Sequence, residues 1–169
     1  MPIVYMDEVV FSKRGFPNRA YSNKGVNITV RQSDVYSGFR TVIAAVNSDM
    51  GLILTDSKEI VTNEERILEF IPKLSVCMGG EPFAMFMDNL ICHKTKPVQK
   101  LYEQFQIQPI WNIADNPDLN AIEICFSAVK LCYKQLWLNA LANNREFDKD
   151  EAIDVAFTKI TPELVKHSA

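Results

Sequence analysis

Two apolar, β-branched runs separated by a short turn constrain the fold more than any other feature. The runs are Thr41–Val46 and Leu52–Thr55, and the residues between them are Asn47-Ser48-Asp49-Met50-Gly51. Asn, Ser, Asp and Gly are the residues that tight turns favour. Two such strand-like runs around turn chemistry predict a β-hairpin.

Further strand signals lie on both sides of this hairpin. Ile3–Phe11 is apolar and β-branched, and Val26–Arg31 alternates apolar and polar residues, which is typical of a half-buried strand. Between them, Ser12–Lys24 has the composition of a loop. A second hairpin is predicted from Ile67–Ile71 and Leu74–Met78, which are broken at Pro72-Lys73 and followed by Gly79-Gly80.

The rest of the chain favours helices. Apolar residues recur at helical spacing over Phe83–Ile91 and Val98–Phe105, whereas Gln106–Ala114 has no clear period. A long helix is predicted from a cap at Asn116, with Pro117 just inside, to about Ala142. Asp148 and Glu151 form a capping box for a last helix, which Thr161-Pro162 interrupts.

These patterns predict one α+β domain over residues 1–169, with antiparallel β-hairpins in the N-terminal half packed against a helical C-terminal half. Residues 1–40 form a basic N-terminal arm or strands, residues 41–80 are β-rich and residues 81–169 are helical. No secretory signal or membrane-spanning run is found, so we expect a cytoplasmic protein that does not enter a membrane.

The charge of the chain is uneven. Residues 1–40 carry six basic and three acidic side chains, a sum of +3, and the whole chain carries −3, so the remainder carries −6. A basic arm could touch nucleic acid or an acidic partner, but a solvated terminus explains it as well. The net negative charge gives no general attraction to nucleic acid and argues against it as a partner.

Strong chemical motifs are missing from the sequence. There is no Gly-rich phosphate loop, and neither the four cysteines nor the two histidines have the spacing of metal ligands. His93 follows Cys92 directly, and adjacent residues of a helix do not face each other, so a Cys-His pair is not expected. We therefore expect no cofactor and no metal site.

The segment over residues 38–93 resembles the opening of a proteasome β-type subunit, a branch of the N-terminal-nucleophile (Ntn) hydrolases. In that family an apolar strand begins at a nucleophilic Thr, turns at a Gly, and returns to end in an Asp-Ser/Thr-Arg-like triplet. Thr41 takes the place of the nucleophile, Asp56-Ser57-Lys58 matches the triplet, and Gly79-Gly80 matches the turn that precedes a helix and holds the oxyanion. Arg66 falls where the family has its Lys.

The resemblance implies a partial Ntn-hydrolase-like sandwich, with Thr41, Asp56, Arg66, Gly79 and Gly80 as candidate catalytic residues. Two departures, Arg40 before Thr41 and an Arg in place of the Lys, favour a silent relative that acts in assembly or binding over a threonine-type peptide hydrolase. The alternative is an unrelated small α+β interaction module without chemistry. The two hypotheses differ in sheet order, because kinship requires the paired strands at 41–46 and 52–56 to be covered by a helix over Phe83–His93.

The long helix has apolar residues on two flanks. One stripe holds Leu119, Ile122, Phe126, Val129, Tyr133, Leu136 and Ala140, while Ile124, Leu131 and Leu138 lie on a different flank at intervals of seven. A second apolar flank needs a cover, either from the same chain or from a partner. We therefore expect a homo-oligomer, or a protein partner that binds through the helical half.

Overall fold

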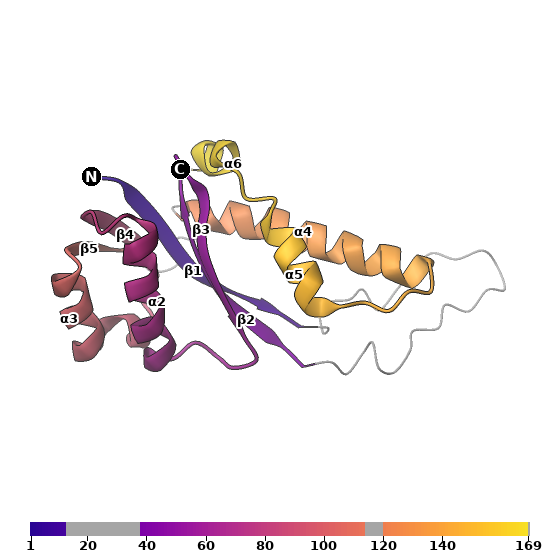
Figure 1. Ribbon diagram of the computed structural model, residues 1–169, viewed down its shortest axis with the longest axis horizontal. Coiled ribbons are helices and arrows are strands. Elements are labelled where there is room, and N and C mark those ends of the chain that lie inside the picture. The colour runs from indigo at the N-terminus through magenta and orange to yellow at the C-terminus, as the bar shows by residue number, and fades with distance from the viewer. Residues whose placement is uncertain (13–37, 114–119, 169) are drawn as a thin grey trace.

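The computed structural model describes residues 1–12, 38–113 and 120–168, which form three layers with a β-sheet in the middle (Figure 1). Helices α2 (Glu64–Cys77) and α3 (Lys96–Gln104) cover one face of the sheet. The other face is covered by α4 (Ala121–Ala142), α5 (Lys149–Phe157) and α6 (Pro162–Ser168). None of the helices in these described ranges has the length and apolar character needed to cross a membrane.

The sheet has five strands in the order β3-β2-β1-β4-β5. Their bounds are β1 (Ile3–Phe11), β2 (Arg40–Asn47), β3 (Gly51–Lys58), β4 (Phe83–Met87) and β5 (Ile107–Trp111). The pairs β1–β2 and β2–β3 are antiparallel, whereas β1–β4 and β4–β5 are parallel. Strand β1 is therefore the central strand, where the antiparallel and parallel halves of the sheet meet.

Successive side chains of β1 point to opposite faces of the sheet. Val4 and Met6 are buried in the core beneath α2 and α3, and Val9 and Phe11 are buried in the core beneath α4 and α5. By this alternation Asp7 faces α4 and Glu8 faces the layer of α2 and α3. One strand thus presents a carboxylate to each face of the sheet.

The first predicted hairpin is confirmed, since β2 and β3 pair in an antiparallel register from Thr41↔Lys58 to Asn47↔Gly51. Gly51 has a φ of +73°, and a Cβ atom there would lie 2.9 Å from the backbone nitrogen of Pro162, at the start of α6. The predicted end of the long helix is confirmed at Ala142. Asp148 caps α5, because its side chain accepts hydrogen bonds from the N–H groups of Asp150 and Glu151.

The second predicted hairpin is wrong, because the residues assigned to it lie in helix α2 and the residue after it. The Asn63 side chain caps this helix by accepting a hydrogen bond from the Arg66 N–H at 3.0 Å. The buried residues Ile67, Phe70, Ile71 and Leu74 recur every three or four positions, as on one face of a helix. Pro72 lies inside the helix and was misread as a break.

The predicted helix over Phe83–Ile91 is also wrong, because Phe83–Met87 is strand β4. This strand lies between two parallel neighbours and is buried on both faces, so its sequence does not alternate. A short apolar run of this kind cannot be told from a buried helix by periodicity. Strand β5 occupies Ile107–Trp111, where no period was found. The division into a β-rich segment 41–80 and a helical segment 81–169 is therefore corrected, whereas the coarser α+β assignment is confirmed.

Some predictions concern residues outside the described ranges. They are the loop over Ser12–Lys24, apart from Ser12, the strand at Val26–Arg31, most of the basic arm, and the cap at Asn116-Pro117. Within the described part of the chain, α4 begins at Ala121, and its N-cap is Asn120 rather than Asn116.

Candidate active site

The candidate site is built around Asp7, a carboxylate in the middle of the central strand. Its side chain is 9% exposed and faces the N-terminal end of α4. The Glu8 backbone N–H donates to its Oδ1 at 2.7 Å, and the amide of Asn120 donates to its Oδ2 at 2.9 Å. A carboxylate at this depth in an apolar sheet destabilises the fold unless it is well paired, so its presence needs a reason.

Asn120 connects this carboxylate to the start of α4. It is 2% exposed, and its Oδ1 accepts a hydrogen bond of 3.4 Å from the Ile122 N–H while its amide holds Asp7. Glu123 lies three residues after the cap, in the first turn of the helix, where a negative charge is favoured by the helix dipole. Asn120, which caps α4 and contacts Asp7, and Glu123, in the first turn of α4, therefore lie at the same end of the helix.

Asp88 joins these two residues from strand β4. The parallel ladder pairs Ile3 with Ala84 and Tyr5 with Phe86. The same register, continued by two residues, sets Asp7 beside Asp88, the first residue after β4. The fold thus brings Asp88, directly after β4, and Glu123, at the start of α4, close enough to Asp7 for their charges to act on it. Among the described residues, the possible ligand atoms that lie within 4.8 Å of one another are those of Glu8, Asp88 and His93.

Electrostatics support this proximity. Burial, opposed by the hydrogen bond from the Glu8 N–H and aided by the negative charges of Glu8, Asp88 and Glu123, raises the pKa of Asp7 from 3.8 to about 7. Burial would also raise the pKa of Asp88, but the contact with His93, the hydrogen bond from the Leu90 N–H, and the charges of His93 and Lys94 lower it. The pKa of Asp7 is therefore raised and the pKa of Asp88 is lowered within one site.

The family model of the DDE superfamily endonucleases matches residues 2–152. This chain belongs to that family. A search of the curated proteins finds no significant match to the sequence.

Solved structures agree with this family at the level of the fold. A Mos1 strand transfer complex matches with a TM-score of 0.70 at 18% identity, covering 99% of this chain and 50% of that one. The Mos1 mariner transposase catalytic domain matches with a TM-score of 0.67 at 15% identity, covering 99% of this chain and 74% of that one. A chain of a simian T-cell lymphotropic virus intasome matches at 0.62 and 15% identity, covering 92% and 46%. This chain spans about half the length of the Mos1 chains in such complexes.

The family match overturns three predictions. The proteasome resemblance is wrong. Kinship required a helix over Phe83–His93 that covers the paired strands. Strands β2 and β3 do pair, but Phe83–Met87 is a strand in the same sheet as β2 and β3 and not a helix. A module without chemistry is not supported in an endonuclease family. The prediction against nucleic acid as a partner is wrong as well, because nucleic acid is the substrate of an endonuclease.

The donor set of the three carboxylates fits a hard divalent cation. Mg²⁺ and Mn²⁺ prefer oxygen ligands, and the residues converging here are Asp7, Asp88 and Glu123. Burial, with a smaller contribution from the negative charges of Asp88 and Glu123, raises the pKa of Asp7, and a bound cation would oppose both effects. Two of the matched Mos1 catalytic-domain structures are described with Mn and with Mg. The sequence predicted no metal site, and these carboxylates are the residues that could hold a metal ion.

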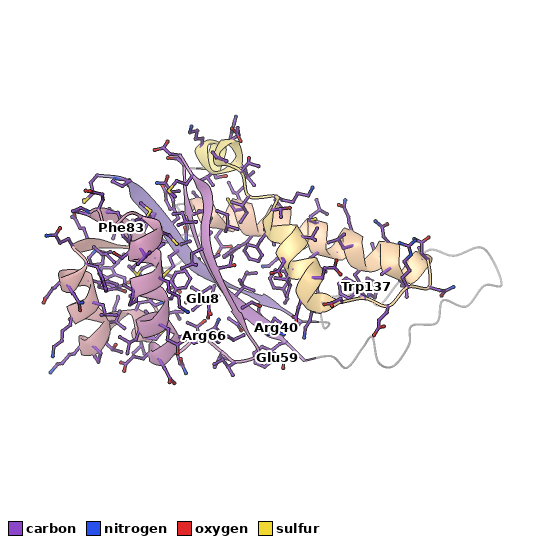
Figure 2. All side chains as sticks on the ribbon, viewed as in Figure 1. Glu8, Arg40, Glu59, Arg66, Phe83 and Trp137 are labelled. Carbon is purple, nitrogen blue, oxygen red and sulfur yellow. The ribbon has the colours of Figure 1, made fainter. Side chains whose placement is uncertain are left out.

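The previously predicted catalytic residues lie elsewhere. Arg66 is 1% exposed, donates to both the backbone and the carboxylate of Asp56 at 2.8 Å, and donates to the Thr41 carbonyl at 3.1 Å. Figure 2 shows Arg66 at the foot of α2. Gly79 and Gly80 follow α2, with φ near +73°, instead of preceding a helix. The catalytic roles of Thr41, Asp56, Arg66, Gly79 and Gly80 stay a prediction, and the resemblance on which that prediction was based is wrong.

Sequence reasoning missed Asp7, Asp88 and Glu123, although each carries a signal. Asp7-Glu8 interrupts an otherwise apolar strand, Asp88 directly follows the apolar run of β4, and Glu123 stands three residues after a capping Asn. What no local pattern provides is their proximity, because 81 residues separate Asp7 from Asp88 in the sequence and 35 separate Asp88 from Glu123.

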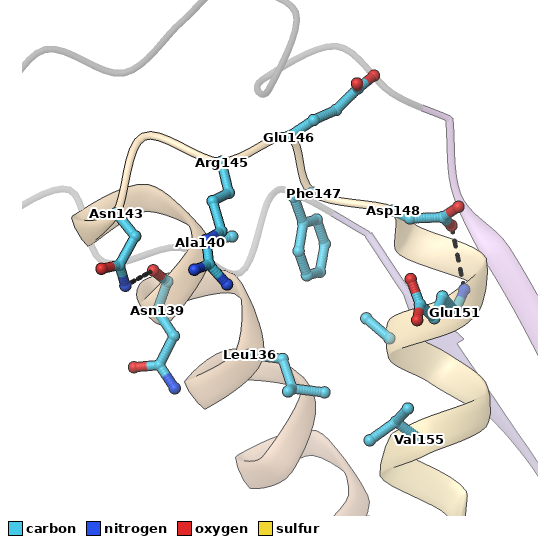
Figure 3. A pocket seen from close by; sticks show the side chains of 11 residues that line it. Leu136, Asn139, Ala140, Asn143, Arg145, Glu146, Phe147, Asp148, Glu151 and Val155 are labelled. Atoms are coloured by element: carbon cyan, nitrogen blue, oxygen red, sulfur yellow. Dashed lines mark hydrogen bonds between the residues drawn. The ribbon is translucent and has the colours of Figure 1, made fainter.

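A surface pocket lies at the far end of α4, away from the carboxylates (Figure 3). It has a volume of about 310 Å³, and its lining includes Leu136, Phe147 and Val155 as well as Asn143 and Arg145. Leu136 is thirteen residues along α4 from Glu123, which is about 20 Å at the helical rise. The pocket is therefore separate from the candidate active site.

Proposed function

We propose that this chain is the catalytic domain, or most of it, of a transposase-type DNA endonuclease that cleaves phosphodiester bonds with a divalent metal ion. The observation that carries the proposal is that Asp88 and Glu123 lie close enough to the buried Asp7 for their charges to contribute to its raised pKa of about 7. Membership of the DDE superfamily endonucleases supports the reaction class. The Mos1 complexes, described with a transposon end and in strand transfer, support DNA as the substrate.

In this proposal the three carboxylates hold Mg²⁺ or Mn²⁺. The chemistry that the metal supplies when bound is polarisation of the scissile phosphate and activation of the attacking oxygen. Asp7 lies in the central strand β1, and hydrogen bonds from Asn120 and the Glu8 N–H fix the orientation of its carboxylate. Asp88 directly follows a strand and Glu123 lies in the first turn of a helix, so each of the three candidate ligands stands in a regular element or next to one.

The rim of the site offers a positive charge for DNA. Lys94 is exposed, lies 4.7 Å over the Trp111 ring, and donates to Asn89 at 2.6 Å. These contacts hold an ammonium group near Asp88, whose pKa it helps to lower. Phosphate contacts of this kind position a duplex without reading its sequence.

Metal binding and nicking of supercoiled plasmid DNA test the proposal. We expect the chain to bind Mn²⁺ in electron paramagnetic resonance titrations and to nick the plasmid with Mg²⁺ or Mn²⁺. Asp7→Asn, Asp88→Asn and Glu123→Gln should each weaken Mn²⁺ binding and reduce nicking at least a hundredfold. Asp154→Asn, which changes an exposed carboxylate of α5, is the matched control and should behave as wild type. Wild-type Mn²⁺ binding and nicking in Asp7→Asn would falsify the proposal.

A further inference from the structure

His93 joins two carboxylates that come from neighbouring strands. It lies in the short 3-10 helix η2 (Ile91–Lys94), and its side chain is fully buried. Its Nε2 lies 3.0 Å from a carboxylate oxygen of Glu8, and its Nδ1 lies 3.1 Å from Oδ1 of Asp88. Nε2 thus makes a hydrogen bond to a carboxylate of the central strand, whereas Nδ1 lies within ion-pair distance of Asp88 in the candidate active site and, among the described residues, makes no hydrogen bond.

Glu8 anchors this ring from the face of the sheet opposite to Asp7. It follows Asp7 in β1, and its side chain is directed to the layer of α2 and α3 (Figure 2). The Glu8 side chain is 9% exposed, so the contact with His93 is shielded from water. The central strand therefore reaches the site twice, directly through Asp7 and indirectly through Glu8 and His93.

The backbone of His93 is fixed as firmly as its ring. The Tyr102 hydroxyl donates to the His93 carbonyl at 3.1 Å, and the His93 N–H donates to the Leu90 carbonyl at 3.1 Å. Tyr102 is 3% exposed and belongs to the core beneath α3. The imidazole consequently cannot move away without disturbing this core.

The consequence for Asp88 is a fixed orientation of its carboxylate. Oδ1 faces His93 Nδ1 and also accepts a hydrogen bond of 3.1 Å from the Leu90 N–H. Within the described residues, Oδ2 receives no hydrogen bond, so this oxygen is left for a ligand. Partners that orient a metal ligand in this way strengthen metal binding and fix the ligand's geometry.

We propose that His93, anchored by Glu8, is a positioning residue that orients Asp88 for metal binding. This inference rests on the proposed function, because it assumes that Asp88 is a metal ligand. A buried histidine with a purely structural role would contribute to the stability of the core but not to the affinity for metal. The two roles can therefore be separated by measuring both quantities.

Two substitutions of His93 divide its contacts. In His93→Asn the side-chain amide can take the place of Nδ1, which keeps the contact with Asp88 and loses the hydrogen bond to Glu8. In His93→Gln the longer amide can take the place of Nε2, which keeps the hydrogen bond to Glu8 and loses the contact with Asp88. Both variants bury one amide in place of the ring, so they are matched in polarity.

The experiment measures the Kd for Mn²⁺ by electron paramagnetic resonance, together with the Tm of each variant in EDTA. We expect His93→Gln to raise the Kd about tenfold and His93→Asn to raise it less than threefold, since loss of an outer partner of a metal ligand costs 10–100-fold in affinity. Asn47→Ala is the control, because Asn47 is a buried amide that bonds the Ile3 carbonyl at 2.7 Å, remote from Asp88. It should lower the Tm without changing the Kd.

Equal Kd values for the two His93 variants, or a Kd unchanged in both, would overturn the inference. If neither variant folds, Glu8→Gln and Glu8→Met replace them. Gln keeps an acceptor for the imidazole and should raise the Kd less than Met, which removes it. Equal Kd values for these two variants again refute the idea. Asp88→Asn shows whether a negative result contradicts the proposed function or only the role of His93. If it binds Mn²⁺ as tightly as wild type, or if wild type binds none, the proposed function fails too. If it loses binding while the His93 variants match wild type, the inference alone fails.

Discussion

Replacing Asp7 with Asn should make the domain more stable as it becomes inactive, and increasingly so at higher pH. The folded-state pKa of Asp7, about 7, lies above its ordinary value of 3.8, so the folded protein binds more protons than the unfolded chain between these pH values. Stability is therefore lost as the pH rises toward and through the folded-state pKa. Applied to one carboxyl group with these two pKa values, the linkage relation gives a loss of about 3 kcal/mol between pH 5 and pH 8.

Asparagine has a similar size and cannot ionise, so Asp7→Asn removes this pH-dependent term. Any cost of exchanging an oxygen for an amide beside Asn120 and the Glu8 N–H is nearly independent of pH and cancels in the comparison. The stability difference between Asp7→Asn and wild type, measured by urea unfolding in EDTA, should therefore shift in favour of the variant by about 3 kcal/mol from pH 5 to pH 8. Saturating Mg²⁺ should restore wild-type stability at pH 8 and have little effect on the variant. Parallel pH profiles for the two proteins would refute the reasoning.

Three further predictions concern residues that the sequence singled out. Arg66→Leu should lower the free energy of unfolding in urea by about 3–5 kcal/mol, because it leaves a carboxylate and three backbone carbonyls without their buried donor. Lys58→Ala is the control: it removes an exposed ion pair and should change the free energy of unfolding little. Thr41→Ala should retain plasmid nicking within twofold, and a complete loss of nicking in a folded variant would restore Thr41 as a catalytic candidate. Leu131→Glu with Leu138→Glu should fold with a Tm close to wild type, because these side chains are 58% and 42% exposed, and unfolding would show that this flank belongs to the core.

The sequence was most informative where a local pattern determines a local structure. The turn residues at 47–51 predicted the β2–β3 hairpin, because a tight turn between β-branched runs has few alternatives. The cap at Asp148 and the end of α4 at Ala142 also followed from local chemistry, since a helix terminus is decided by the hydrogen bonds of a few neighbouring residues.

Periodicity failed where tertiary contacts override it. Helix α2 is not predicted from its sequence because Pro72 resembles a break between two strands. Strand β4 is not predicted because a strand buried between two parallel neighbours has no polar face. The error at β4 was decisive for function. It hid the end of the strand, which is where Asp88 stands.

The sequence by itself determined that the chain folds as α+β, where its first hairpin turns, where α4 ends and where α5 begins. Only the tertiary structure decided which polar residues form a site. Arg66 and Asp56, 10 residues apart, became a buried structural pair, whereas Asp7, Asp88 and Glu123 came together through parallel pairing of β1 with β4 and the docking of α4 on the other face of β1. Parallel pairing joins strands that are distant in the chain, and no short-range pattern encodes which distant strands will be neighbours.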